Sequence, residues 1–329
     1  MNEPREAPTF KYNDPRTADA PRDAARPKKR DVNGWFILDK PTGMTSTHAV
    51  AIVKRLFRAK KAGHAGTLDP LASGCLPIAL GEATKTVPFV MDGRKAYRFT
   101  VSWGSETDTD DSEGRVTIRS EQRPSRDDVE RALPQFTGLI MQRPPNYSAI
   151  RIAGERAYDL ARDGEAIELE PREILIEDLA VVEHDASATT LEARTGKGAY
   201  VRAIARDLGR TLGCCGHVSA LRRTRVGPFV ESDFVALPPK READAPPDDD
   251  ALMASLKPPG AALAELPTII VSRGDAGRLL RGQGVLLRGR EAPVEASAVA
   301  VISEGALIAI GEISAGELRP RRVFHLDRR

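Results

Sequence analysis

The stretch GHAGTLDPLASG, residues 63–74, holds one histidine, His64, and one aspartate, Asp69, among three glycines and Pro70. Glycines and a proline at this density indicate a loop of defined shape, because they select backbone angles that helix and strand interiors do not use. A carboxylate on such a loop can act as a nucleophile at a sugar carbon and stabilise oxocarbenium-like charge. The structural alternatives are that Asp69 caps a helix beginning at Pro70, and that His64 is an ordinary loop histidine.

A second group of candidate residues lies in GKGAYVRAIARDLG, residues 196–209. Tyr200 and Arg202 stand two residues apart at a predicted junction between a strand and a helix. A tyrosine at such a place can offer a stacking face to a base, and an arginine can hold a carboxylate. The alternative is that Tyr200 only packs against neighbours and that Arg202 only faces solvent.

Several well-known catalytic patterns are missing from the sequence. It contains no GxxxxGK[ST] phosphate loop, no dinucleotide-binding glycine fingerprint after a strand, and neither HExxH nor GxSxG. The three cysteines are Cys75, Cys214 and Cys215, and their spacing fits no zinc site. We therefore expect a protein that works without a nucleotide, nicotinamide or metal cofactor.

The charge of the chain is nearly balanced, with 49 Lys and Arg against 47 Asp and Glu. Basic residues nevertheless gather in four clusters, at 26–30, 54–61, 221–225 and 319–322. Each cluster alone is typical of solvated surface, but four of them in a near-neutral protein predict charge separated by face, which suits a polyanion. The sparse cysteines, and the absence of a long apolar run or a signal-peptide core, favour a cytoplasmic protein without a membrane partner.

The hydrophobic pattern predicts strands and helices without a regular βαβ order, so we expect an α+β fold. The expected strands cover 35–38, 97–102, 173–184 and 189–200. Two helices are expected: one that is capped by Thr45 or Ser46, and one that runs from 200 to about 212.

Length and composition predict two domains in the 329 residues. Residues 1–30 are rich in Pro, Arg, Asp and Ala, and we expect a disordered tail with a basic end. A larger domain is expected at 31–236, a Pro-rich, charged linker at 237–265, and a small β-rich domain at 266–329.

Seven motifs, in order along residues 34–229, closely resemble those of bacterial TruB-type tRNA pseudouridine-55 synthases. They are GWFILDKPTGMTS, GHAGTLDPLASGCLPIALGEATK, KAYRF, GSETDTDDSEG, QRPPNYSAIRIAGERAYDLAR, GKGAYVRAIARDLG and HVSALRRTRVGPF. The resemblance implies a catalytic domain with a central mixed, mainly antiparallel sheet flanked by helices, followed by a PUA-like RNA-binding domain. It also implies an isomerase that needs no cofactor.

The resemblance implies a role for each matching residue. Asp69 matches the family's nucleophilic aspartate, and Arg202 matches the arginine that pairs with it. Tyr97 matches the tyrosine that stacks on the target base and can take part in proton transfer. His64 matches the histidine that enters the RNA loop, and Tyr200 matches a second aromatic residue of the pocket.

Four further positions are carried over in the same way. Leu221 matches a position whose backbone contacts the uracil edge, and Lys40 matches a lysine that supports the catalytic loop. Lys85 is expected to belong to the same supporting or RNA-contacting group. Arg151 stands where the family usually has lysine, so we expect RNA contact to survive with altered geometry.

The function implied is the isomerisation of uridine 55 in the tRNA T-loop by base flipping. The partner is then tRNA, through its T-arm and elbow, and we expect a monomer without an obligate protein partner. Two alternatives stay open. One is an RNA-folding chaperone of the tRNA elbow, a role that can coexist with catalysis. The other is a nucleoside or glycoside hydrolase using Asp69, although the sequence offers no obvious second carboxylic acid for it.

Overall fold

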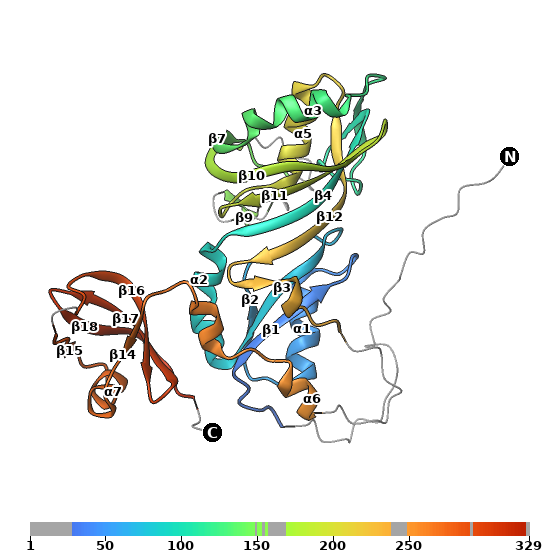
Figure 1. The fold of residues 1–329 in the computed structure, drawn as a ribbon. Coiled ribbons are helices and arrows are strands. Elements are labelled where there is room, and N and C mark those ends of the chain that lie inside the picture. Colours follow the sequence, from blue (N-terminus) through green and yellow to red (C-terminus); the bar gives the residue numbers. More distant parts are fainter. Residues whose placement is uncertain are drawn as a thin grey trace, which may run out of the picture.

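The computed structural model describes residues 28–148, 150–152, 155–156, 169–237, 249–289 and 292–326. The expected tail therefore lies almost wholly outside the described residues, as does the first part of the expected linker. No helix within the described ranges is long and apolar enough to cross a membrane. Two sheets of unequal size dominate the fold, and Figure 1 shows the smaller one, in red, to one side of the larger.

The larger sheet confirms the expected α+β fold, because it is mixed and mainly antiparallel. Its strand order is β1-β3-β12-β4-β11-β10-β7, with β2 attached to β3 and β13 to β12. Among the described strand pairs of this sheet, β12 and β3 alone run parallel. The strands are β1 (Gly34–Lys40), β2 (Ala62–His64), β3 (Ser73–Leu80), β4 (Lys95–Trp103), β7 (Gly138–Gln142), β10 (Arg172–His184), β11 (Ala188–Thr195), β12 (Gly216–Val226) and β13 (Phe229–Val230).

Short helices flank this sheet, and two small hairpins extend from it. The α-helices are α1 (Ser46–Leu56), α2 (Val87–Asp92), α3 (Arg126–Ala132), α5 (Val201–Thr211) and α6 (Asp249–Ala254). The 3₁₀ helices are η2 (Gly81–Thr86), η3 (Leu133–Phe136), η4 (Glu231–Asp233) and η5 (Pro259–Leu263). The hairpins pair β5 (Ser105–Thr107) with β6 (Val116–Arg119), and β8 (Arg151–Ile152) with β9 (Glu155–Arg156).

Strand β1 is buried on both faces. Successive side chains of a strand point to opposite faces, so Phe36 and Leu38 enter one hydrophobic cluster while Trp35 and Ile37 enter another. The first cluster also receives apolar side chains from α1, α3 and α5, and the second includes Ala262 of η5. Burial on both faces explains why WFIL is an unbroken apolar run rather than an alternating one.

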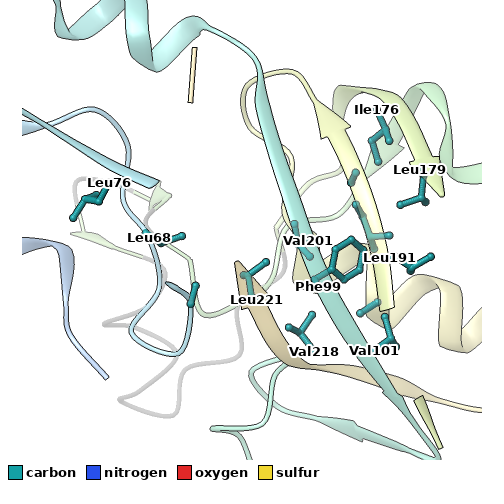
Figure 2. Packing of buried hydrophobic residues seen from close by; sticks show 14 of the residues in the cluster. Leu68, Leu76, Phe99, Val101, Ile176, Leu179, Leu191, Val201, Val218 and Leu221 are labelled. Atoms are coloured by element: carbon teal, nitrogen blue, oxygen red, sulfur yellow. The ribbon is translucent and has the colours of Figure 1, made fainter. Parts of the chain in front are cut away.

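The first cluster continues across the middle of the sheet, where Figure 2 shows it around Phe99 of β4. The register partners of Phe99 are Leu191 on β11 and Leu221 on β12. Val201, the first residue of α5, belongs to the same cluster and is 5% exposed. The N-terminal end of α5 is therefore packed against the centre of the sheet.

The main expected helices are confirmed, and one expected strand is too long. Thr45 caps α1 through its side-chain oxygen, and α5 covers nearly all of the helix expected at 200–212. The strand expected at 189–200 is wrong in its second half, since β11 ends at Thr195. Gly198, with φ of 85°, bends the chain there, in a conformation that is readily accessible to glycine.

The described part of the expected linker packs on the larger sheet. Lys257 and Trp35 exchange backbone hydrogen bonds of 2.8 and 2.9 Å. The segment before η5 therefore lies along β1, at the edge of the larger sheet. Ala262 is 5% exposed in the second hydrophobic cluster. These residues therefore contribute to the core of the larger unit.

The smaller sheet has the strand order β14-β16-β17-β18-β15 and is accompanied by one described helix. Its elements are β14 (Thr268–Ile270), α7 (Arg273–Leu280), β15 (Val285–Leu286), β16 (Ala296–Ser303), β17 (Ala306–Ser314) and β18 (Glu317–Val323). This confirms the β-rich character expected for the C-terminal part.

The two sheets are joined by polar contacts from η2. The Lys85 ammonium donates to the Val323 carbonyl at 2.8 Å, and its Nζ lies 5.7 Å from the centre of the Phe324 ring. The Glu82 carboxylate accepts a hydrogen bond from the His325 N–H at 2.8 Å. Because η2 directly follows β3, the smaller sheet is connected to the strand that leaves the GHAGTLDPLASG loop.

We predict that Gly74→Ala destabilises the protein much more than Gly43→Ala. Both glycines have positive φ, +97° and +78°, so each alanine is expected to cost about 1–2 kcal/mol in backbone strain. A Cβ at position 74 would also lie 2.3 Å from the Arg223 carbonyl oxygen, whereas nothing lies within 4 Å at position 43. Chemical denaturation should show about 2 kcal/mol of additional loss for Gly74→Ala. Equal losses would contradict the close approach of β3 and β12.

Candidate active site

Asp69 lies on the loop between β2 and β3, and no helix follows it. The helix-cap alternative for Asp69 is therefore wrong. Ser46, at the start of α1, holds the residue before it: the Ser46 hydroxyl donates to the Leu68 carbonyl and accepts from the Leu68 N–H, both at 2.9 Å. The Asp69 carbonyl accepts the Ala72 N–H at 3.1 Å, which closes a tight turn.

The Asp69 carboxylate forms an ion pair with Arg202 of α5, with 3.0 Å between Oδ2 and Nε. The Arg202 side chain is 7% exposed, whereas that of Asp69 is 36% exposed. The guanidinium also donates to the carbonyls of Thr109 and Tyr147, both at 2.9 Å, and lies 3.7 Å from the Asp111 carboxylate. A buried cation held by two backbone carbonyls thus orients a carboxylate that still reaches solvent.

Lys40, at the end of β1, is completely buried behind the loop. Its ammonium donates to the carbonyls of Pro41, Met44 and Pro70, at 2.9, 2.8 and 3.2 Å. Burial lowers the pKa of Lys40 to about 8, although the Asp69 carboxylate raises it. The lysine therefore joins the turn after β1 to the backbone directly after Asp69.

Arg223 on β12 is a site residue that the sequence analysis missed. It is 3% exposed, and its guanidinium donates to the carbonyls of Cys75, Thr67 and Gly66 at 2.8, 3.1 and 3.2 Å. The arginine thus fixes the N-terminal side of the loop, opposite Lys40. The available signal was strand periodicity, because Arg223 stands two residues after the apolar Leu221 and so shares its face.

The basic cluster at 221–225 is consequently not an open cationic surface. Arg223 is buried, and Arg222 pairs with Asp39 at 2.9 Å and with Glu231 at 2.8 Å. Sequence alone could not show this, because the partners come from distant strands and loops.

Two tyrosines lie beside the ion pair. Tyr97 of β4 is the register partner of Arg223. Burial raises the pKa of its phenol, the Arg223 guanidinium lowers it and the Asp69 carboxylate raises it. Tyr200 precedes α5, and its backbone N–H and carbonyl bond the Gln142 amide at 2.9 and 3.1 Å. Burial also raises the pKa of Tyr200, which feels the charges of both Arg202 and Asp69.

His64 and Leu221 lie next to the same loop. His64 ends β2, where burial lowers the pKa of its imidazole and the Arg223 guanidinium lowers it further. Leu221 lies one residue before the point where β3 begins to pair with β12, at Arg222 and Arg223. Its backbone therefore lies beside the start of β3, where the Asp69 loop ends.

Of the two remaining expected site residues, Lys85 lies apart from this cluster and the Arg151 side chain is not described. The bonds of Lys85 join η2 to the smaller sheet, through Glu82 and Val323, rather than to the Asp69 loop. Arg151 belongs to the hairpin β8–β9, and its side chain lies outside the described residues. The described cluster therefore contains Asp69, Arg202, Tyr97, Tyr200, His64, Leu221 and Lys40, with Arg223 added.

We predict that Lys40 gives the protein a stability that rises with pH above 8. A lysine whose folded pKa is about 8 binds fewer protons in the folded than in the unfolded chain between pH 8 and its ordinary pKa of 10.5, so unfolding becomes less favourable as pH rises. The free energy of unfolding of the wild type, relative to Lys40→Met, should increase across this range. The exposed Lys61→Met is the matched control. A pH-independent difference between wild type and Lys40→Met would contradict the burial of a charged ammonium.

Comparison with known proteins gives the family. Three family models match consecutive parts of the chain: TruB family pseudouridylate synthase (N terminal domain) at 54–201, tRNA pseudouridylate synthase B C-terminal domain at 202–264, and Pseudouridine synthase II TruB, C-terminal at 267–324.

Whole-length relatives agree with these models. The chain is 58% identical over 322 residues to the tRNA pseudouridine synthase B of Rhodopseudomonas palustris, covering 95% of this chain and 87% of the relative. It is 57% identical over 329 residues to that of Bradyrhizobium diazoefficiens, covering 99% and 95%. Among solved structures, an archaeal box H/ACA sRNP Nop10-Cbf5 complex shares the fold, with a TM-score of 0.67 at 23% identity over 95% of this chain and 94% of that one. The chain therefore belongs to the TruB family of pseudouridylate synthases and is an isomerase.

Proposed function

We propose that this enzyme converts uridine 55 in the T-loop of tRNA to pseudouridine, with Asp69 as the nucleophile. The observation that carries the proposal is the ion pair between Asp69 and Arg202, in which the carboxylate is 36% exposed and the guanidinium 7%. The name tRNA pseudouridine synthase B, borne by relatives that are 57 and 58% identical, supports tRNA as the substrate.

The reaction exchanges one bond to the ribose for another. The stacked uridine must first leave the T-loop, because its reacting atoms are inaccessible within the stack. The N1–C1′ bond breaks with the help of the Asp69 carboxylate, the uracil turns, and C5 bonds to C1′. C5 then loses its proton and N1 gains one, so the product is an isomer and no co-reactant is consumed. Asp69 suits this role because Arg202 orients its carboxylate without covering it.

The surrounding residues suit a flipped base. A tyrosine ring beside the carboxylate offers a stacking face, and the raised pKa of Tyr97 keeps its phenol protonated and able to donate. Tyr200 lies near the same two charges and supplies a second aromatic wall. The lowered pKa of His64 keeps its ring neutral, which favours its insertion among RNA bases.

Leu221 suits recognition of the uracil edge through its backbone. In the described strand pairs, β12 meets β3 at Arg222 and Arg223. At Val218, the same edge of β12 meets Asp111 of the loop after β5. The edge of β12 at Leu221 lies between these two contacts, so its backbone polar groups are placed to meet the hydrogen-bonding groups of a base.

The substrate also defines the roles of the larger parts. We assign catalysis to 31–236 and RNA binding to the PUA-like part at 266–329, with 237–265 as the connection. In this assignment the T-arm and elbow of tRNA contact both parts of a cytoplasmic monomer. Lys85 contributes by holding the smaller sheet in place, through its bond to Val323, rather than by contacting the reacting base.

The hydrolase alternative acquires one structural argument. The pKa of Glu113 is raised by partial burial and by the nearby carboxylates of Asp111 and Asp69, which is the direction a general acid requires. Product analysis separates the two reactions, because a hydrolase releases free uracil whereas the isomerase leaves pseudouridine within the intact RNA strand.

We predict that Asp69→Asn abolishes pseudouridine formation on an unmodified tRNA transcript while leaving tRNA binding within about twofold, since the amide keeps the shape but is a poor nucleophile. Position-resolved mapping of pseudouridine and a filter-binding titration measure the two effects. Asp92→Asn, in an exposed ion pair with Lys197, is the matched control. Product formed by Asp69→Asn would remove Asp69 from the nucleophile role, and binding that persists is what an additional chaperone activity requires.

We predict that Arg202→Ala lowers the single-turnover rate by roughly thirtyfold or more, equivalent to about 2 kcal/mol, because it removes the group that orients the nucleophile. The single-turnover rate of Arg202→Lys should fall between those of Arg202→Ala and the wild type, since lysine retains the charge without the planar geometry. Arg98→Ala, which breaks an exposed pair with Glu192, is the control. A wild-type rate for Arg202→Ala would contradict the pairing as a catalytic requirement.

A further inference from the structure

Helix α5 carries two further arginines in line with Arg202. Residues four apart lie on one face of a helix, so the side chains at 202, 206 and 210 form a row. Opposite them runs the acidic segment 106–111, and each arginine faces one of its carboxylates. The three pairs, called here the arginine row, are Arg202 with Asp111 at 3.7 Å, Arg206 with Asp110 at 3.0 Å, and Arg210 with Glu106 at 2.7 Å.

Arg206 repeats, one turn along α5, the contacts that Arg202 makes. Arg202 bonds the carbonyls of Thr109 and Tyr147, and Arg206 bonds the Asp110 carboxylate and, at 2.8 Å, the Arg143 carbonyl. Both arginines therefore span the same two segments, the acidic one and the one after β7. The Arg206 side chain is 8% exposed, so this guanidinium is not a surface group that waits for RNA.

Arg210 closes the row at its outer end. Its Nε lies 2.9 and 3.1 Å from the two Glu106 oxygens, and its terminal nitrogen 2.7 Å from one of them. The Glu106 side chain is 4% exposed and that of Arg210 57%. Glu106 is therefore a buried carboxylate that depends on this two-point contact, because a buried charge without a partner is strongly unfavourable.

The acidic segment needs such support. Asp110 has φ of 61°, in the left-handed region that side-chain-bearing residues rarely adopt, and burial raises its pKa to about 6. The same segment supplies Arg202 with two of its partners, the Thr109 carbonyl and the Asp111 carboxylate. A shift of this segment would therefore move the guanidinium that meets Asp69.

We propose that Arg206 and Arg210 are positioning residues for catalysis. They hold the segment 106–111 on α5. The Thr109 carbonyl and the Asp111 carboxylate then stay in the positions from which they hold the Arg202 guanidinium beside Asp69. The proposal rests on the proposed function for its kinetic consequence. It places the effect on the chemical step and not on RNA binding, because neither arginine has to touch the substrate.

The test exchanges the charges of the outer pair. Arg210→Glu and Glu106→Arg should each lower the single-turnover rate by about tenfold or more, since small displacements of a catalytic group cost this much, with tRNA affinity within about twofold. The double variant, which restores opposite charges, should recover most of the rate. Arg126→Glu, which breaks the exposed pair with Glu130 on α3, is the matched control and should behave as wild type.

A second readout does not depend on activity. Amide hydrogen exchange of residues 107–112 should accelerate in Arg210→Glu and return toward wild type in the double variant. If the wild-type protein forms no pseudouridine, the proposed function is refuted. Hydrogen exchange of residues 107–112 would still test whether Arg210 holds the acidic segment in place. Faster exchange with an unchanged single-turnover rate, or a double variant as slow as the singles, would overturn the proposal.

A conservative pair of variants covers the case in which the exchanged charges prevent folding. Arg206→Lys keeps a cation near Asp110, whereas Arg206→Met removes it. The lysine variant should retain several-fold more single-turnover activity than the methionine variant at equal tRNA affinity. Equal rates for the two would show that Arg206 contributes only packing and would overturn its assigned role.

Discussion

The site depends on burying the Arg202 guanidinium without leaving its charge unsatisfied. Removing a charge from water is costly unless its donors find acceptors in the protein. Arg202 finds them in the Thr109 and Tyr147 carbonyls and in the Asp69 carboxylate. These acceptors lie on three separate loops, so the loops are held together by the requirement to satisfy one cation. The Asp69 side chain is 36% exposed although its guanidinium partner is 7% exposed, so the carboxylate reaches solvent.

The second constraint is the backbone of the Asp69 loop, which two buried cations hold from opposite ends. Lys40 bonds the Pro70 carbonyl just after Asp69, and Arg223 bonds the Gly66 and Thr67 carbonyls before it. Each cation comes from a strand beside β3, Lys40 from β1 and Arg223 from β12. The strand order therefore determines the loop geometry, and the close contact of Gly74 with β12 explains why the second residue of β3 is a glycine.

Features that depend on residues close together in the sequence could be predicted, and features that depend on distant residues could not. The α1 cap at Thr45, the alternation along β4 and the start of α5 depend on neighbours within a few residues, and these predictions are confirmed. The overlong strand at 189–200 shows the limit, because β11 stops at Thr195, where its partner β4 begins at Lys95, and the sequence of 189–200 does not show that partner. Arg223 was missed since its acceptors lie about 150 residues earlier in the chain.

By itself the sequence determined the family, the α+β class and the chemical types available at the site, because motifs such as GTLDP and GAYVRAIARDLG persist as local patterns. Tertiary structure alone decided which cations are buried and which acceptors they meet. It buried Arg223 of the basic cluster at 221–225, placed Lys85 between the sheets, and aligned three arginines of α5 with a distant acidic segment. The physical reason is that charge pairing acts between residues that the fold brings together, and the linear spacing of the chain carries no record of those distances.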